Sequence, residues 1–384
     1  MGGSLVSGSA GSGAGKERYP ALTGIRAFGA IAVFFAHLPL RPDWHIVINV
    51  MAFFYALSGF LIVRIYHERA QISAAWLSKY FINRFARIYP VYFLLLTVAV
   101  CLQRDLRPAV LVTNYTLTHA LFYPSKIILQ PSWSLTVEEC FYALAPLFMI
   151  LARRRGFGAA LALGVGLLAA ALAISELDIR FLQTPLFVFS TTFFGHVAEF
   201  LAGVWLALYV TRLERTGELR VKGGRLTLAG LIAVSVLCMA MVLIYRHPPR
   251  DAAAAIVLVN NFLIPAPIAL LYCGLIREDT VLSRALSCGL ARLLGRSSYS
   301  FYLLHALVIE YLGMPVLQAL PQYRPAVVLG IFVVTWGLAI GLFLYYEEPM
   351  NLAIRRAARE PENPTDRLQG SHVRLNPAPP DGYS

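Results

Sequence analysis

Two histidines stand in apolar segments of the sequence, where ionisable side chains are costly. His37 follows Arg26 by 11 positions, about three helical turns, and His305 completes an i, i+4, i+7 stripe with Ser298 and Tyr302. Placing a charged residue at mid-membrane costs roughly 2.5–3.5 kcal/mol, so such residues are candidates for function. Imidazole exchanges protons near neutral pH, which predicts His37 as a general base above an anion-binding Arg26. The structural alternative is a snorkelling arginine and a hydrogen-bonded histidine.

Two adjacent glutamates enter another apolar helix within the segment Pro131–Tyr142, PSWSLTVEECFY. By helical spacing Ser134 and Glu138 share one face, while Glu139 lies on the next. A serine N-cap, with acids favoured by the helix dipole, accounts for one glutamate. The second glutamate and Trp133 are then left to orient a histidine or to stack on a sugar ring.

The elements that carry these residues are those of a membrane protein. Of the 384 residues, 58% are strongly apolar and 14% are charged, whereas a soluble domain carries about 25% charged residues. Apolar blocks of roughly 17–25 residues, long enough to cross a ~30 Å hydrocarbon core, recur about ten times. We place these spans near residues 23–40, 46–66, 84–103, 136–151, 157–174, 190–210, 225–245, 253–276, 297–315 and 326–346.

The distribution of positive charge orients this bundle. With these spans, 25 of the 33 Lys and Arg residues fall on the side of the two termini, and short loops rich in Lys and Arg resist translocation. The predicted fold is therefore an all-α integral membrane protein, a bundle of about ten transmembrane helices with both termini in the cytoplasm. The net charge of +12 reflects topology, and the sequence indicates the lipid bilayer as partner and no nucleic acid.

The chain divides into three parts by composition. Residues 1–18 form a flexible Gly/Ser-rich tail, 19–349 the transmembrane domain, and 350–384 a polar, disordered cytoplasmic tail. The moderately apolar segment 103–131 is expected on the outer side, folding back into the mouth of the bundle. Pro349 is expected to end the last helix. Because every connection is short, we expect the chemistry to take place inside the bundle.

Basic and acidic residues meet on the predicted cytoplasmic side. Apolar residues within 71–87 recur at helical spacing between cations, which predicts a helix lying in the interface with Arg84 and Arg87 at the headgroup level. The Glu347–Glu348 pair that closes the last span is expected to pair with Arg84, Arg87 or Arg296. These charges and the intramembrane histidines together outline a polar passage through the bundle.

Five motifs in order make the sequence similar to the membrane acyltransferase 3 family, over roughly residues 19–349. They are LTGIR leading from Leu22 to Arg26 and on to His37, FFYALSGFL at Phe53–Leu61, RFARIYP at Arg84–Pro90, SWSLTVEECFY at Ser132–Tyr142 and SYSFYLLH at Ser298–His305. The resemblance implies transfer of an acyl group, most often acetyl, from cytoplasmic acetyl-CoA to a hydroxyl. It further implies that Arg26 and His37 are essential and that Arg84 and Arg87 serve the donor.

The resulting hypothesis gives each candidate a role. Acetyl-CoA, a co-substrate with no permanently bound cofactor beside it, places its phosphates on Arg26, Arg84 and Arg87. His37 takes a proton from the acceptor hydroxyl, and a glutamate orients the imidazole. The glutamate is either of Glu138 and Glu139, and direct transfer and an acetyl-histidine intermediate remain alternatives. The acceptor or the oxyanion is expected at Trp133, Ser134, Tyr302 and His305.

The acceptor implied by the resemblance is a glycan, free or lipid-linked, of the exopolysaccharide or lipopolysaccharide type, in the inner (plasma) membrane. The five cysteines form no C-x-x-C pair and no cluster with histidine, so the sequence indicates no metal site. The rival interpretation is a proton-coupled secondary transporter that uses the same intramembrane His and Glu residues. A third is a non-catalytic partner of a flippase. Oligomeric state is left open by the sequence.

Overall fold

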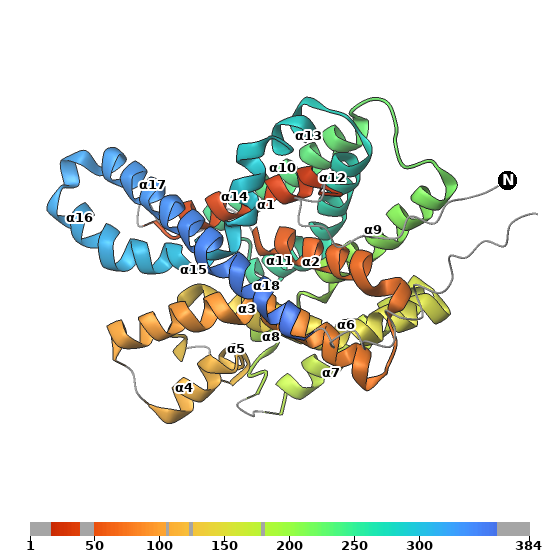
Figure 1. Ribbon diagram of the computed structural model, residues 1–384, viewed down its shortest axis with the longest axis horizontal. Helices are drawn as coiled ribbons and strands as arrows, with labels where there is room; N and C mark the ends of the chain where they lie inside the picture. The colour runs from red at the N-terminus through yellow and green to blue at the C-terminus, as the bar shows by residue number, and fades with distance from the viewer. Residues whose placement is uncertain (1–16, 39–49, 105–106, 123–125, 178–180, 359–384) are drawn as a thin grey trace, which may run out of the picture.

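A computed structural model describes residues 17–38, 50–104, 107–122, 126–177 and 181–358, which form helices and turns with no strand among them (Figure 1). The first half contains α1 (Pro20–Ala36), α2 (Val50–Tyr66), α3 (Ala74–Gln103), α4 (Pro108–Tyr115), α5 (His119–Phe122), α6 (Trp133–Arg155), α7 (Phe157–Ser175), α8 (Pro185–Thr191) and α9 (Val197–Thr216). The second half contains α10 (Arg225–Arg246), α11 (Ala252–Val257), α12 (Pro265–Arg277), α13 (Val281–Leu286), α14 (Gly289–Arg296), α15 (Ser298–Val308), α16 (Met314–Ala319), α17 (Arg324–Leu342) and α18 (Glu348–Ala357).

The protein is an all-α multi-pass membrane protein. In the described part of the chain, 8 helical stretches are long and apolar enough to cross a bilayer. Two further predicted spans correspond to α1, which has 17 residues, and to α9, which carries charged residues near its end. Several spans are compound, because π-helical turns at Leu258–Leu263 and Ile309–Gly313 join α11 to α12 and α15 to α16. The number of spans and the side of the termini stay predictions.

The close helix crossing between α2 and α9 depends on two glycines. A Cβ atom on Gly59 would lie 2.2 Å from the carbonyl oxygen of Phe200, and one on Gly203 would lie 1.9 Å from that of Ala56. Any side chain at either position would therefore force the helices apart. Small residues at such crossings let helix backbones pack where lipid supplies no hydrophobic driving force. The crossing fixes α2, which carries one wall of the cavity described below.

Two predictions about helix ends are wrong. Residues 71–87 do not form a separate interfacial helix, because Ser73 caps the Trp76 amide and α3 runs unbroken for 30 residues. Pro349 does not stop the last helix, because it lies in the first turn of α18, where a missing N–H costs nothing. A π-helical turn at Phe343–Glu347 connects α17 to α18, so the helix continues past this proline.

The predicted outer segment does pack on the bundle, as expected. Tyr92 of α3 donates a hydrogen bond to the carbonyl of Asn114 at 2.6 Å, and the fully buried Asn114 side chain bonds the backbone of Lys126 and Ile128. This segment therefore covers the end of α3. The predicted tails lie almost wholly outside the described residues, apart from the helix that continues to Ala357.

Candidate active site

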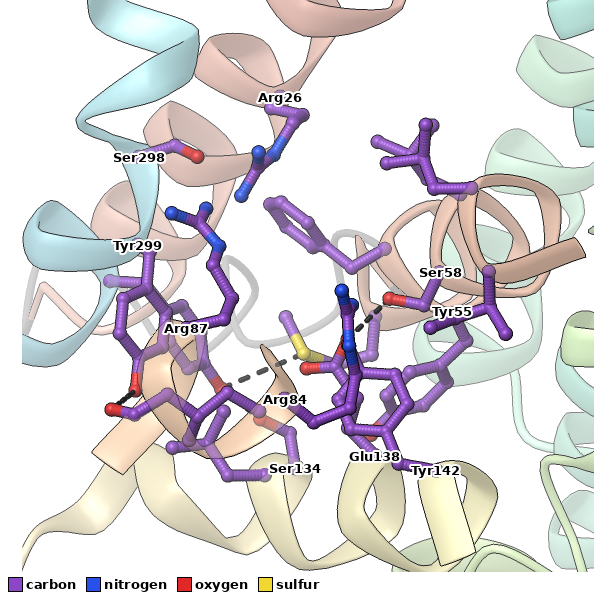
Figure 2. A pocket seen from close by; sticks show the side chains of 18 of the residues that line it. Arg26, Tyr55, Ser58, Arg84, Arg87, Ser134, Glu138, Tyr142, Ser298 and Tyr299 are labelled. Carbon is purple, nitrogen blue, oxygen red and sulfur yellow. Dashed lines mark hydrogen bonds between the residues drawn. The ribbon is translucent and has the colours of Figure 1, made fainter. Parts of the chain in front are cut away.

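A cavity of about 250 Å³ lies among α1, α2, α3, α6 and α15, with α18 at one edge (Figure 2). The apolar part of its wall comes mainly from α2. Its polar lining consists of Arg26, Tyr55, Ser58, Arg84, Arg87, Ser134, Glu138, Tyr142, Ser298, Tyr299, Tyr302 and Arg355. The structure thus brings six of the ten predicted site residues into one space, from four helices that are far apart in sequence.

The guanidinium groups of Arg26 and Arg87 point towards each other across the cavity (Figure 2). Arg87 forms an ion pair with the Glu347 carboxylate at 2.5 Å. This carboxylate is 2% exposed and also accepts a hydrogen bond from Ser300 at 2.7 Å. The predicted pairing of this glutamate is confirmed, and Glu348 likewise pairs with Arg296. Within the described residues Arg26 has no hydrogen-bond partner. Its charge is therefore available to an anion or a polarised carbonyl.

Arg84 is positioned by aromatic rings. Its guanidinium carbon lies 5.4 Å from the centre of the Tyr66 ring and 5.5 Å from that of Tyr142, and Nη2 donates to the Tyr66 hydroxyl at 3.3 Å. Aromatic faces orient a cation without neutralising it as a carboxylate would. The side chain therefore keeps its charge for a ligand.

Only one of the two adjacent glutamates faces the cavity. Glu138 accepts hydrogen bonds from Ser58 and Tyr142, and Ser134, Glu138 and Tyr142 line the cavity together at i, i+4, i+8. Glu139 is not part of the lining, and its Oε1 is buried without a partner. The expectation that a glutamate orients His37 is wrong, because α6 turns Glu138 towards α2.

His37 and His305 instead face each other, with ring centres 4.9 Å apart. His37 Nδ1 is 2.9 Å from the Val33 carbonyl oxygen, and His305 Nδ1 is 2.6 Å from that of Tyr302. A carbonyl can only accept, so each Nδ1 carries the hydrogen in a neutral ring and each Nε2 keeps a lone pair. His305 is fully buried and its Nε2 has no partner, whereas His37 is exposed.

Tyr302 stands between the cavity and the histidine pair. Its hydroxyl lies 2.7 Å from Ser134 Oγ and donates to the Pro131 carbonyl at 2.8 Å, while its ring centre is 5.7 Å from that of His305. Neither histidine lines the cavity itself. Trp133 also lies outside it, with its ring centre 6.4 Å from that of His196. The predicted site is therefore divided into an arginine-lined chamber and a histidine pair, and Tyr302 lines the first and contacts His305 of the second.

The serine cap proposed for α6 is absent from the structure. The first turn has no side-chain cap, Ser132 bonds the Leu129 carbonyl and His119, and Ser134 bonds Tyr302. The serine-cap part of the structural explanation is therefore wrong.

Comparison with known proteins identifies the family. The family model described as an acyltransferase domain, acyltransferase 3, matches residues 19–346. The chain belongs to the acyltransferase 3 family. It is 26% identical over 330 residues to the acyltransferase MdmB of Streptomyces mycarofaciens, covering 77% of this chain and 80% of that protein.

Two further relatives share the domain. A putative acetyltransferase, ORF330 of Acidianus two-tailed virus, is 28% identical over 78% of this chain and 86% of that protein. The peptidoglycan O-acetyltransferase OatA of Listeria monocytogenes is 26% identical over 79% of this chain, which spans only 51% of that protein. No solved structure matches the chain significantly. This protein is therefore a membrane acyltransferase of the acyltransferase 3 family.

Sequence reasoning missed several residues in the lining of this cavity and one buried pair outside it. Ser58 is the one serine or threonine in the apolar helix α2, and Tyr142 follows Glu138 by one helical turn, so each had a detectable pattern. The buried pair of His196 and Glu199, 2.9 Å apart at i, i+3, also went unnoticed. Arg355 lies beyond the family match, in a region that composition assigned to a tail.

Proposed function

We propose that this acyltransferase moves an acetyl group from cytoplasmic acetyl-CoA to a hydroxyl of a polysaccharide or lipid-linked glycan at the plasma membrane. The observation that carries the proposal is the contact between the His37 and His305 rings, each of which uses Nδ1 on a backbone carbonyl, beside an arginine-lined cavity. The relatives named as acetyltransferase and peptidoglycan O-acetyltransferase support the acyl group and the oxygen acceptor.

The donor enters the cavity between the arginines. Arg26 has no protein partner among the described residues and Arg84 is held only by tyrosines, so both guanidinium groups are free to bind polar groups of the donor. Arg87, fixed by Glu347, adds a third cation. The thioester carbonyl then reaches the deep end of the cavity, beside the hydroxyl groups of Ser134 and Tyr302.

The chemical step uses the histidine lone pair. His37 Nε2 takes the proton of the acceptor hydroxyl while that oxygen attacks the thioester carbonyl. The C–S bond breaks, the thiolate leaves, and the imidazolium returns the proton to the sulfur, which balances the reaction. Once Tyr302 and Ser134 release the Pro131 carbonyl, their hydroxyl groups donate to the negative oxygen of the tetrahedral intermediate. Because Tyr302 lies between the cavity and the histidines, its side chain must turn aside for the reaction.

The test is transfer by the purified protein in lipid nanodiscs. Acetyl-CoA carrying label in the acetyl group is supplied with a glycan acceptor, and the label in the glycan is measured by mass spectrometry. We expect label in ester linkage and free CoA in equal amount. A proton-coupled transporter would give no transfer in nanodiscs, and would instead show proton-driven uptake in sealed vesicles. That pair of results would overturn the proposal.

A further inference from the structure

A second cavity, of about 500 Å³, lies between the end of α2, the start of α3 and α18. It carries three cations, Arg69, Lys79 and Arg355, and its lining contains no acidic residue. Arg355 and Ile65 line both this cavity and the arginine-lined chamber, so the two adjoin. Figure 1 shows α18 crossing α3, which is how the last helix closes this space.

One wall of the second cavity is a rigid aromatic cluster. The rings of Trp76 and Tyr80 stack with centres 5.3 Å apart and an interplanar angle of 11°. Tyr66 meets both rings edge-on, at 6.2 and 5.1 Å. The Tyr80 hydroxyl donates to the Tyr142 carbonyl, which ties the cluster to α6. Trp76 is half-buried, so this wall combines a fixed π-surface with nearby positive charge.

Arg355 marks the junction of the two cavities. Its Nε atom is buried, and no partner for it exists among the described residues. It repels Arg84 and Arg87, whose charges reach it across the junction. A half-buried guanidinium that lies among other cations is stabilised when it binds an anion. The junction of the two cavities is therefore suited to a negatively charged group.

We propose that the second cavity binds the adenine-nucleotide end of the acyl donor. The phosphates lie on Arg69, Lys79 and Arg355, the purine packs on the Trp76 wall, and the pantetheine arm passes Arg355 into the chamber. This assignment rests on the proposed function. It moves the donor phosphates away from the three chamber arginines, which then contact the arm and the thioester.

Size and chemistry both favour this division of the donor. The chamber of about 250 Å³ falls below the ~300–1,000 Å³ of pockets that enclose a whole ligand. A donor as long as acetyl-CoA must therefore extend beyond it. An anionic lipid headgroup shares the phosphate chemistry, but it has no planar base to use the aromatic wall.

The experiment compares two thioesters, acetyl-CoA and acetyl-pantetheine, which lacks the nucleotide. In the double variant Arg69→Gln/Lys79→Gln we expect KM for acetyl-CoA to rise about tenfold or more, as loss of charge-assisted hydrogen bonds predicts. KM for acetyl-pantetheine and kcat for both donors should stay as in the wild type. The matched control is Arg154→Gln/Lys222→Gln, which removes the same two charges from exposed positions outside this cavity. Equal changes with both donors, or unchanged KM values, would overturn the assignment.

A binding arm separates this inference from the proposed function. Adenosine 3′,5′-bisphosphate is titrated into the protein in zwitterionic nanodiscs, with heat of binding as the readout. We expect binding to the wild type and the control, and about tenfold weaker binding to Arg69→Gln/Lys79→Gln and to Trp76→Leu. Absence of acetyl transfer with this binding pattern intact would refute only the proposed function. Binding that ignores all three substitutions would refute the inference.

The lipid alternative is tested in the same arm. The titration is repeated in nanodiscs that contain anionic phosphatidylglycerol. A nucleotide site keeps its dependence on Arg69 and Lys79 in both lipids. A headgroup site would bind no bisphosphate in zwitterionic lipid, and the substitutions would instead reduce phosphatidylglycerol retention, which would overturn the assignment.

Discussion

Two histidine sites in this protein contain the same side chain in opposite states of hydrogen bonding. At the first, His37 and His305 each use Nδ1 on a backbone carbonyl, and neither Nε2 has a hydrogen-bond partner among the residues that the structure describes. At the second, His196 uses both ring nitrogens, Nδ1 with Glu199 at 2.9 Å and Nε2 with the Ser190 carbonyl at 3.3 Å. Burial does not distinguish them, because His196 and His305 are both nearly inaccessible.

The difference shows which feature indicates chemistry. A ring nitrogen that keeps its lone pair can accept a proton from a substrate, whereas a ring with both nitrogens engaged serves to connect structural elements. His196 connects α8 to α9 through its hydrogen bonds, and its ring packs on that of Tyr55 with ring centres 5.2 Å apart. We therefore propose that the first site serves catalysis and that the second gives structural support.

The largest effect should follow from loss of the His37 lone pair. His37→Ala is expected to lower kcat for acetyl transfer by about 10²–10⁴-fold, the usual contribution of general acid–base catalysis. The thermal midpoint in detergent should stay near that of the wild type, because this side chain is exposed. Added imidazole should restore part of the activity, since it supplies the missing base at an accessible position.

The control for this variant is His247→Ala, which removes an exposed histidine at the end of α10. It should leave both kcat and stability unchanged. Wild-type turnover by His37→Ala would remove the basis for assigning chemistry to the first site.

At the second site, a substitution should change the stability of the protein and not its activity. Glu199→Ala leaves His196 Nδ1 buried without its hydrogen-bond partner, and leaving a buried polar group unsatisfied costs about 1–3 kcal/mol. We expect a large drop in the free energy of unfolding, measured by denaturant titration in mixed micelles. The kcat of the fraction that remains folded should be unchanged. A stable variant with lost activity would contradict the comparison, because it would make this pair catalytic.

Periodicity and composition were sufficient to predict the membrane fold and most of the chamber. Long apolar blocks predict spans whatever the tertiary contacts, and i, i+4 spacing placed Ser134 with Glu138 on the face that lines the cavity. The residue that a side chain contacts on another helix cannot be predicted in this way, because it depends on how the helices rotate and cross. The crossing fixed by Gly59 and Gly203 turns Ser58 towards Glu138. No spacing within α6 could indicate that contact.

The end of the chain shows a second limit. Proline and a polar composition indicated a stop at Pro349, but a π-helical turn carried the helix on to Ala357. Such a turn depends on buried contacts, here those of Glu347 with Arg87 and Ser300. Arg355 reaches its place between the two cavities only because of this continuation.

A smaller effect should show whether the orientation of Arg87 matters in addition to its charge. Glu347→Gln removes the buried carboxylate that fixes Arg87, and we expect KM for acetyl-CoA to rise about tenfold with a lesser change in kcat, as loss of one charged hydrogen bond predicts. The matched control is Glu348→Gln, whose pair with Arg296 is largely exposed and contributes about 0–1 kcal/mol. Equal effects of the two variants would mean that the orientation of Arg87 is irrelevant to donor binding.

The smallest effect tests whether a free ring nitrogen is sufficient to indicate catalysis. His119, in the outer segment, contacts Ser132 Oγ through Nε2 at 3.1 Å, and its Nδ1 is buried without a partner. It lies outside the cavity lining, so we expect His119→Gln to retain wild-type kcat. If kcat fell as in His37→Ala, a free ring nitrogen alone would be sufficient to indicate a functional histidine. His119 would then have to be counted as a third histidine site, a catalytic one.

The role left for His119 is in pH-dependent stability. Burial lowers its pKa from 6.5 to about 4, so the folded state resists protonation that the unfolded state accepts. Between these two values the unfolded chain binds more protons, and stability falls as the pH is lowered, by up to about 1.4 kcal/mol per pH unit from this one group. Unfolding measured from pH 7 to 4 should show a shallower decline for His119→Gln than for the wild type. The same slope in both proteins would place the pH sensitivity elsewhere, because only a histidine that is neutral when folded produces this difference.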